Sequence, residues 1–379
     1  MSSAPLPRAL VLALLAFAAA IPLRAEDPGA TGTTAAAPAA AAEPEWLTGT
    51  AQGTPLPILD ADDEQVRKLV AWYGDAGGEF RWRIRKKGEQ DRVRIWQLEV
   101  ESAVKIGVEE NDWIRGYFYE PLTPAQGKRP AAVVLHHLGG EFTAEEMLAK
   151  MLAENGIVTT FMYFPYYDKR WPKDRGPAPG IISEDMDHVL QAFRQSVLDA
   201  HRLGDWLLSR PEVDPQRLGL TGISLGAVVG ALAVGVDPRF QKVALVMAGG
   251  DLTSILLKNG EMVDVKKKLQ ERGLTPEFLR EKLRPIEPLS FAHRVNGANV
   301  LLLNATDDEI IPKDCTRALW REMGKPKMKW YKGGHYSLGI YVVDVIQQVA
   351  RSLVSPVLPR GARATEEETS VAPTGDGKE

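Results

Sequence analysis

A serine flanked by two glycines marks the segment of this chain with the clearest chemical meaning. Gly222, Ser224 and Gly226 form the pattern Gly-x-Ser-x-Gly between a predicted strand and an apolar run at residues 227–234. A nucleophile presented on a sharp strand-to-helix turn brings neighbouring chain close, and glycines two positions before and after it relieve that crowding. The pattern also fits an ordinary Gly/Ser-rich turn. The strand before it and the helix after it favour a nucleophilic Ser224.

A serine hydroxyl needs a base, and the base needs an orienting acid. An acidic segment at residues 307–309 (DDE) follows a predicted strand at residues 300–304. His335 lies in a Gly-rich loop after the next predicted strand, residues 328–331. The carboxyl ends of parallel strands meet at one edge of a sheet, so an acid of this segment and His335 would lie beside Ser224. The chain order Ser, acid, His is the order of this arrangement.

The remaining histidines have simpler interpretations. His188 and His201 lie in a predicted amphipathic helix at residues 184–209, where a surface or packing role is expected. His293 lies in a connection, where a structural hydrogen bond is expected. A turn histidine that caps local backbone is the alternative interpretation of His335.

Acyl transfer also needs hydrogen-bond donors aimed at the developing oxyanion. The amide of Leu225, the residue after the nucleophile, is the first predicted donor. The second should come from a loop after an earlier strand, and residues 135–140 (LHHLGG) leave such a strand and turn at two glycines. We predict the amide of Leu138 as the second donor, with that of His137 as the next choice.

Composition excludes several classes of protein. The chain has 379 residues, of which 44% are hydrophobic and 25% charged, with a formal net charge of −4. These values exclude collagen-like, disulfide-scaffold and wholly disordered proteins, and they give no sign of a nucleic-acid partner. The single cysteine, Cys315, excludes an internal disulfide. Adjacent histidines such as His136 and His137 seldom converge on one ion, so we predict neither a metal site nor a cofactor.

The two ends of the chain read as non-globular. Residues 1–25 are typical of a secretory signal peptide, with an apolar core shorter than the roughly 20 residues of a membrane-spanning helix. We therefore expect a secreted or periplasmic protein with no membrane span in its mature chain. Residues 26–55 are an Ala/Pro-rich linker and residues 359–379 a polar tail, both predicted to be disordered. One domain is expected over residues 56–358.

Strand-like and helix-like segments alternate through this domain. Predicted buried strands occupy residues 131–135, 157–164, 217–221, 243–247, 300–304 and 328–331, and predicted helices occupy residues 62–73, 143–154 and 184–209. A partly exposed antiparallel pair is predicted at residues 93–100 and 113–119. The alternation predicts an α/β fold, a mostly parallel sheet with helices on both faces. The charge-rich segment 251–289 interrupts it, either as a small helical cap or as a longer surface connection.

These segments together resemble the α/β-hydrolase superfamily over residues 113–354. Residues 136–140 (HHLGG) are similar to its oxyanion loop, residues 222–226 to its nucleophile turn, residues 307–312 (DDEIIP) to its acid loop and residues 334–335 to its Gly-His pair. The resemblance implies Ser224 as nucleophile, His335 as base and Asp308 as acid. Asp308 is preferred to Asp307 because the acid of the family stands four residues before the proline.

Within the superfamily, the chain looks most similar to secreted bacterial esterases of the dienelactone-hydrolase-like and acetylxylan-esterase-like kinds. Two residues depart from the pattern. His137 stands where the family usually has glycine, and Ser224 stands where the dienelactone hydrolases proper have cysteine. The substrate of those hydrolases is therefore not implied for this chain.

The sequence as a whole predicts a serine hydrolase that cleaves small carboxylic esters through an acyl-enzyme intermediate. A prolyl-oligopeptidase-like peptidase is the enzymatic alternative, although residues 46–110 are too short for the N-terminal propeller of that family. A non-catalytic binding protein with a hydrolase fold is the third interpretation.

Overall fold

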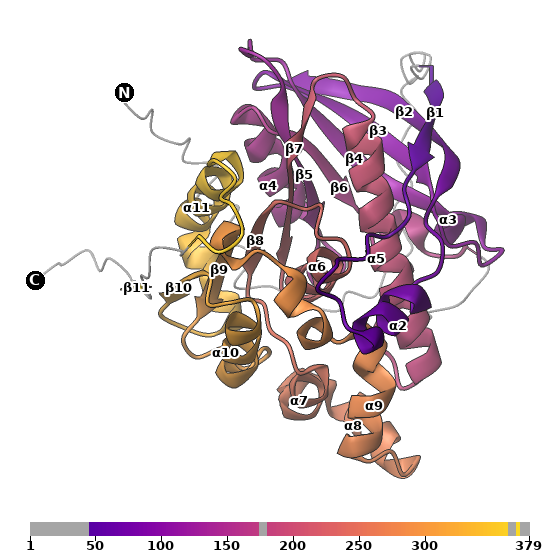
Figure 1. Ribbon diagram of the computed structural model, residues 1–379, viewed down its shortest axis with the longest axis vertical. Helices are drawn as coiled ribbons and strands as arrows, with labels where there is room; N and C mark the ends of the chain where they lie inside the picture. Colours follow the sequence, from indigo (N-terminus) through magenta and orange to yellow (C-terminus); the bar gives the residue numbers. More distant parts are fainter. Residues whose placement is uncertain (1–44, 174–179, 363–368, 372–379) are drawn as a thin grey trace, which may run out of the picture.

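An eleven-stranded sheet forms the centre of the computed structural model, which describes residues 45–173, 180–362 and 369–371. Its strands lie in the order β1-β2-β3-β4-β6-β5-β7-β8-β9-β10-β11 (Figure 1). The antiparallel end consists of β1 (Leu47–Gly53), β2 (Gly78–Gln90), β3 (Val93–Glu101) and β4 (Trp113–Pro121). The parallel part consists of β5 (Arg129–Leu135), β6 (Val158–Met162), β7 (Val213–Ile223), β8 (Lys242–Val246), β9 (Val300–Ala305), β10 (Lys327–Tyr331) and β11 (Thr369–Val371).

Helices cover both faces of the parallel strands. They include α4 (Thr143–Glu154), α5 (Met186–Leu208), α6 (Leu225–Val236), α10 (Lys313–Glu322) and α11 (Val342–Val354). Within β7, Gly219 faces Leu353 of α11, whereas the next residue, Leu220, faces Gly230 of α6. Successive strand residues point to opposite faces, so α6 and α11 lie on opposite sides of the sheet. The predicted mostly parallel sheet with helices on both faces is confirmed.

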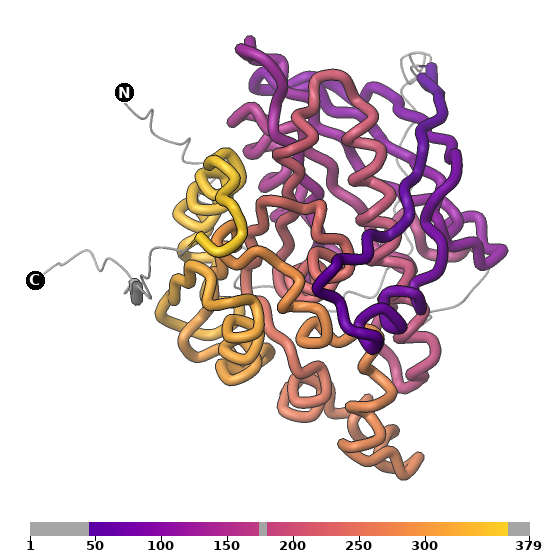
Figure 2. The backbone as a smooth tube through the Cα atoms, in the orientation of Figure 1, coloured from indigo at the N-terminus to yellow at the C-terminus, as the bar shows by residue number. Residues whose placement is uncertain are grey.

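The sandwiched position explains the apolar runs in the sequence. Every residue of β6, β8 and β9 is buried. A strand covered on both faces by helices buries both sets of side chains, so it reads as a continuous apolar run. The predicted antiparallel pair is also present, as β3 and β4. Figure 2 shows α10 and α11, near the C-terminal end of the chain, on the opposite side of the molecule from β1 and β2.

The N-terminal end of the sheet corrects the predicted boundaries. The linker prediction for residues 26–55 is wrong at its end, since Leu47–Gly53 forms β1, antiparallel to β2. The sequence analysis also missed β2 itself, whose charged residues hide the apolar alternation. Pairing decides this strand: Trp82 of β2 lies across Gly49, where an added Cβ would be 2.5 Å from the indole ring. A composition count does not see such a contact between distant residues.

The C-terminal tail needs a similar correction. Residues 359–379 were predicted to be disordered, but Thr369–Val371 forms β11, parallel to β10. Three residues gain a partner strand at the sheet edge, which a polar composition does not exclude. The predicted signal peptide and most of the predicted linker, residues 1–44, lie outside the described part of the chain. Among the described residues, no helix is both long and apolar enough to cross a membrane.

The segment 251–289 is helical, as the cap interpretation predicted. It contains α7 (Leu252–Lys258), a 3₁₀ turn η3 (Gly260–Met262), α8 (Val263–Glu271) and α9 (Pro276–Leu283). Leu269, Leu279 and Leu283 are buried, which anchors the segment through an apolar side. Figure 1 shows α7, α8 and α9 gathered at one end of the molecule, away from β1–β3. Shorter elements elsewhere are α2 (Glu64–Trp72), α3 (Glu109–Asp112), η2 (Asp168–Arg170) and η8 (His335–Tyr341).

Candidate active site

Ser224 lies on a strained turn between β7 and α6. Its φ of 53° and ψ of −115° are disfavoured for a residue with a side chain, and such strain persists only where the surroundings impose it. A Cβ on Gly222 would lie 2.2 Å from the carbonyl oxygen of Gly226, and one on Gly226 would lie 2.4 Å from that of Leu135. Both glycines are therefore required by close backbone approach. The Ser224 amide donates to the Val246 carbonyl at 2.9 Å, which ties the turn to β8.

A continuous chain of hydrogen bonds joins Ser224, His335 and Asp308. The Ser224 Oγ lies 2.8 Å from Nε2 of His335, and the Nδ1 of His335 lies 2.9 Å from each carboxylate oxygen of Asp308. A carboxylate only accepts, so the ring proton is at Nδ1 and Nε2 is left to accept the serine proton. Ser224 is 7% exposed and His335 6% exposed. The structure thus brings together the three side chains that the sequence analysis selected.

Loop geometry separates Asp308 from its neighbour Asp307. The Oδ1 of Asp308 accepts the amides of Ile310 at 2.9 Å and Ile311 at 2.7 Å, which fixes this carboxylate beside the imidazole. Asp307 is exposed, and its carboxylate accepts the hydroxyl of Thr306 at 2.8 Å. Of the two aspartates, only Asp308 orients His335.

Glu309 is a residue near the site that the sequence analysis did not select. Its carboxylate accepts the backbone amide of His335 at 2.9 Å, and an added Cβ on Gly334 would lie 2.5 Å from Glu309 Oε2. The Asp307 amide also donates to the Gly333 carbonyl at 3.0 Å. The acid loop and the histidine loop are therefore held to each other through backbone as well as side chains. The sequence showed Glu309 as the third acid of the DDE segment. It gave no sign that this acid contacts the backbone of His335.

The helical cap touches the histidine loop through Tyr336. The hydroxyl of Tyr336, the residue after His335, donates to Glu261 of η3 at 2.6 Å. Partial burial and the neighbouring Glu261 carboxylate raise the pKa of Tyr336 above its usual value. The rings of His335 and Tyr336 meet edge to face, with centroids 5.6 Å apart. The helical segment is thereby joined to the residue that follows His335.

The predicted oxyanion donors lie at the start of α6 and on a loop that meets it near Ser224. Leu225 is the first residue of α6, and Leu138 lies in the loop after β5. The close approach of Gly226 to the carbonyl groups of Leu135 and His136 places the start of α6 against the start of that loop. The alternative donor, the amide of His137, is engaged, because it donates to Glu145 Oε1 at 3.0 Å. Leu138 therefore stands as the better second candidate.

His136 supports this loop from below. Its Nδ1–H donates to the His137 carbonyl at 2.6 Å, and its Nε2 accepts the Phe164 amide at 2.9 Å. Burial lowers the pKa of His136 to about 3, so its ring is neutral at pH 7. Both nitrogens are occupied by backbone groups, which leaves no lone pair for a metal. Among the described residues, no group of three or more His, Cys, Asp or Glu side chains has the arrangement of a metal site.

A hollow of about 370 Å³ opens beside the predicted oxyanion loop. Leu138 and both glycines after it form one wall, and an aromatic segment after β6 forms the other. The lining residues are Leu138, Gly139, Gly140, Tyr166, Tyr167, Asp168, Trp171 and Gly180. Tyr166 and Asp168 adopt positive φ values of 64° and 41°. Arg170 holds this segment, since its buried guanidinium pairs with Asp199 at 2.7 Å and donates to the Tyr163 carbonyl at 3.0 Å.

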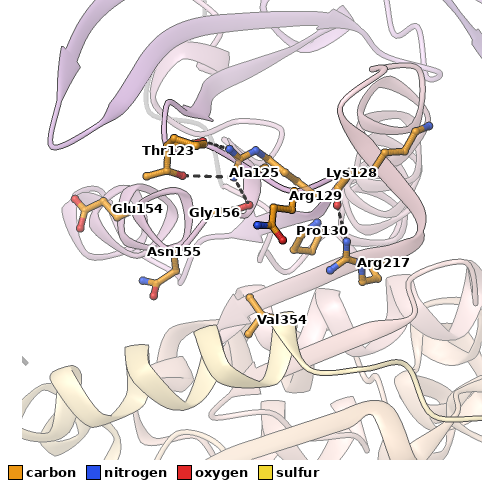
Figure 3. A pocket seen from close by; sticks show the side chains of 13 residues that line it. Thr123, Ala125, Lys128, Arg129, Pro130, Glu154, Asn155, Gly156, Arg217 and Val354 are labelled. Carbon is orange, nitrogen blue, oxygen red and sulfur yellow. Dashed lines mark hydrogen bonds between the residues drawn. The ribbon is translucent and has the colours of Figure 1, made fainter. Parts of the chain in front are cut away.

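A second, larger hollow of about 500 Å³ lies at the opposite edge of the sheet (Figure 3). It surrounds Arg129, the first residue of β5, whereas the candidate site follows the last residue of the same strand. Its lining residues are Thr123, Pro124, Ala125, Gln126, Gly127, Lys128, Arg129, Pro130, Glu154, Asn155, Gly156, Arg217 and Val354. Ser224, Asp308 and His335 take no part in it.

Sequence comparisons find a partial relative. No family model matches the chain. An uncharacterized protein of Mycobacterium tuberculosis is 27% identical over 174 residues, which span 45% of this chain and 41% of that protein. The match thus covers less than half of the curated relative.

Solved structures match over a larger part of the chain. An acetyl xylan esterase from Paenibacillus sp. has a TM-score of 0.58 at 18% identity, covering 78% of this chain and 96% of that one. Acetyl xylan esterase 1 from Thermoanaerobacterium sp. has a TM-score of 0.56 at 20% identity, covering 80% and 97%. A puromycin-hydrolyzing peptidase of Mycobacterium tuberculosis has a TM-score of 0.52 at 16% identity, covering 76% and 47%. At such identities the likeness shows the fold alone.

Proposed function

We propose that this chain, which has the α/β-hydrolase fold, is a serine hydrolase that cleaves carboxylic esters. One observation carries the proposal: the hydrogen-bonded chain from Ser224 Oγ through His335 to Asp308. A strained serine, an imidazole with its proton on Nδ1 and a carboxylate behind it are the parts that activate a hydroxyl for attack on a carbonyl. The signal peptide predicted at residues 1–25 supports a location outside the cytoplasm for this activity.

Acylation follows from the geometry. His335 Nε2 accepts the Ser224 proton while Oγ forms a bond to the ester carbonyl carbon, and the carbonyl electron pair moves onto oxygen. Asp308 stabilises the imidazolium that results, without taking its proton. The amides of Leu225 and Leu138 stabilise the oxyanion. When the intermediate collapses, the bond to the alcohol oxygen breaks, and this oxygen takes the proton from His335 Nε2.

Deacylation repeats these steps with water. His335 removes a proton from water as the oxygen attacks the acyl carbon, and the bond to Ser224 Oγ then breaks. Ser224 recovers its proton from His335, and a carboxylic acid leaves. The order of events needs no group other than these side chains, two amides and water.

The hollow beside Leu138 supports a small or medium-sized ester as substrate. Tyr166, Tyr167 and Trp171 give it aromatic walls, and the carboxylate of Asp168 adds an acceptor at its rim. Such a lining suits a neutral group that has both an apolar face and hydroxyls. The two acetyl xylan esterases among the structural neighbours act on acetyl esters by their names, which makes acetyl esters the first substrates to test.

Covalent labelling tests the proposal directly. A fluorophosphonate probe should label the full-length protein at Ser224, and the protein should release p-nitrophenol from p-nitrophenyl acetate. Ser224→Ala should lose the label and lower kcat by about 10⁴-fold or more, because the residual rate comes from binding and the oxyanion donors alone. Ser209→Ala is the matched control, since this hydroxyl donates to the Trp206 carbonyl at the end of α5, and it should keep both activities.

Three outcomes separate the interpretations. Equal ester turnover by Ser224→Ala and the parent would contradict the proposal. A parent protein that binds small esters but takes no label at Ser224 would support the non-catalytic interpretation. Cleavage of proline-containing peptides at rates above those for acetyl and longer acyl esters would support the peptidase, in line with the peptidase among the structural neighbours.

A further inference from the structure

We infer that Glu145 and His137 act as a positioning pair, which sets the backbone amide of Leu138 for the oxyanion. The inference rests on the proposed ester hydrolysis and deepens it. His137 and Glu145 do not touch the reacting atoms in this scheme. They act through the loop that carries the second amide, and they occupy a place outside the hydrogen-bonded chain of Ser224, His335 and Asp308.

Both polar contacts of this pair meet at one oxygen atom. Glu145 Oε1 accepts the backbone amide of His137 at 3.0 Å and the ring Nδ1–H of the same residue at 2.7 Å. The carboxylate therefore fixes the backbone and the ring of His137 together. Glu145 is fully buried at the third position of α4, where the amino end of a helix favours a negative charge.

Leu138 is held from both of its neighbours. On one side, His137 is fixed by Glu145. On the other, Gly139 lies on the His137 ring, and an added Cβ there would be 2.8 Å from Nε2. The Leu138 side chain is itself 39% exposed and supplies little anchorage. The direction of its amide is therefore set by the residues around it. The His137 ring packs under the turn and supports it.

The start of the loop, at His136, is also held in place. Two backbone groups occupy both ring nitrogens of His136, and Gly226 of α6 lies against the His136 carbonyl. The loop thus enters from a rigid point beside Ser224 and bends over His137. An error of about 1 Å in a catalytic donor lowers a rate by roughly 100-fold, so a loop of this kind needs such a support.

The buried hydrogen bonds make the pair interdependent. The other carboxylate oxygen of Glu145, Oε2, is buried with no hydrogen-bond partner among the described residues. A buried carboxylate that lost the ring donor would keep one donor only, and its unmet hydrogen-bonding demand would displace the loop. Removing His137 alone should therefore harm catalysis more than removing both partners.

The test compares an ester with its thionoester, in which sulfur replaces the carbonyl oxygen. Sulfur is a weak acceptor, so the oxyanion amides stabilise the thionoester transition state less. Glu145→Ala should lower kcat for p-nitrophenyl acetate by about 100-fold, the loss found when an oxyanion donor is removed, with little change in KM. Its kcat for the thionoester should fall by less than about tenfold. A general disturbance of the fold would lower both rates equally.

Further variants keep the test decisive if Glu145→Ala does not fold. His137→Leu, which has no ring donor, should show the same selective loss for the oxygen ester, and His137→Leu/Glu145→Gln should be faster than His137→Leu alone. His137→Asn, whose amide nitrogen takes the place of Nδ1 and can still donate to Glu145, should recover part of the rate. Glu146→Gln is the matched control, since this neighbouring carboxylate accepts the Tyr163 hydroxyl, and its ratio of ester to thionoester rates should equal that of the parent.

Two results would overturn the inference. One is an equal loss on ester and thionoester in Glu145→Ala or His137→Leu, with unchanged circular dichroism and melting temperature. The other is parent-like kcat in His137→Leu. In both cases fluorophosphonate labelling of Ser224 would persist, whereas failure of the proposed function would show as an unlabelled parent protein.

Discussion

The parallel strands have a hollow at their amino ends, called here the amino edge, and another at their carboxyl ends, the carboxyl edge. The larger of these two hollows is not the candidate site. At the amino edge, about 500 Å³ opens around Arg129 and Arg217. The Arg129 guanidinium donates to the carbonyl of Thr123, and that of Arg217 donates to the Lys128 carbonyl at 2.6 Å. These donors hold surrounding backbone in place. At the carboxyl edge, the polar atoms converge instead on one serine oxygen.

The backbone conformation near the two hollows differs as well. The amino-edge hollow places positive φ values at Gly127 and Gly156, where no side chain opposes them. At the carboxyl edge, positive φ values also occur at residues with side chains, among them Tyr166, Asp168 and Ser224. Each such residue costs about 1–3 kcal/mol, and the surrounding structure offsets that cost. Volume alone therefore says less about a site than convergent polar groups on strained backbone do.

The largest expected effect at the carboxyl edge beyond the loss of Ser224 comes from Asp308. Asp308→Asn keeps the shape but favours the wrong tautomer of His335, so kcat for p-nitrophenyl acetate should fall by about 10³–10⁴-fold. Asp307→Asn is the control, since its carboxylate meets Thr306 instead, and it should stay within about threefold of the parent. Parallel losses in both variants would show that the loop geometry does not separate these aspartates.

A pH effect on stability should come from His136, at the same edge. Burial lowers the pKa of this ring to about 3, from 6.5 in the unfolded chain. Between these values the unfolded chain binds a proton that the folded state does not, so stability present above pH 6.5 is lost as the pH falls toward 3. One such group contributes a slope of about 1.4 kcal/mol per pH unit.

The measurement for this effect is urea unfolding at several pH values. His136→Gln should be less stable at pH 7, because it loses a buried partner, yet its stability should fall less steeply between pH 6 and pH 4 than that of the parent. His188→Gln is the control, since this ring lies at the start of α5 and bonds the Gly180 carbonyl. Parallel curves for His136→Gln and the parent would mean that His136 takes up its proton in the folded state.

The smallest expected effect lies at the amino edge. Arg217 is paired with Asp214 at 2.7 Å on a partly exposed surface, where an ion pair contributes about 0–1 kcal/mol. Arg217→Ala should leave kcat/KM for esters within about twofold of the parent and lower Tm by no more than about 4 °C. A loss of ester turnover as large as that of Asp308→Asn would remove the contrast between the two hollows.

Local patterns in the sequence predicted much of the parallel part of the fold. Short, mainly apolar runs marked β5, β8 and β9, because strands covered on both faces bury both sets of side chains. The prediction of a nucleophile turn came from two glycines around Ser224, since close backbone approach there is a property of the turn itself. The acidic segment and His335 were placed at the same edge because parallel strands end together.

Only the tertiary structure revealed strands β1 and β2 and the contacts that support the candidate site. β1 is a strand because Trp82 and the rest of β2 pair with it, and β2 has charged residues that mask its alternation. Asp308, preferred from a family resemblance, is distinguished physically by the Ile310 and Ile311 amides that fix it beside His335.

Glu309 and Glu145 read as ordinary acids in the sequence, and only the folded chain shows that one accepts the His335 amide and the other both donors of His137. The sequence by itself therefore determined the strained turn at Ser224 and the edge at which its partners lie, because strands, turns and glycine positions depend on residues close in the chain. The tertiary structure decided which carboxylates hold which loops, because those contacts join residues that only folding brings together.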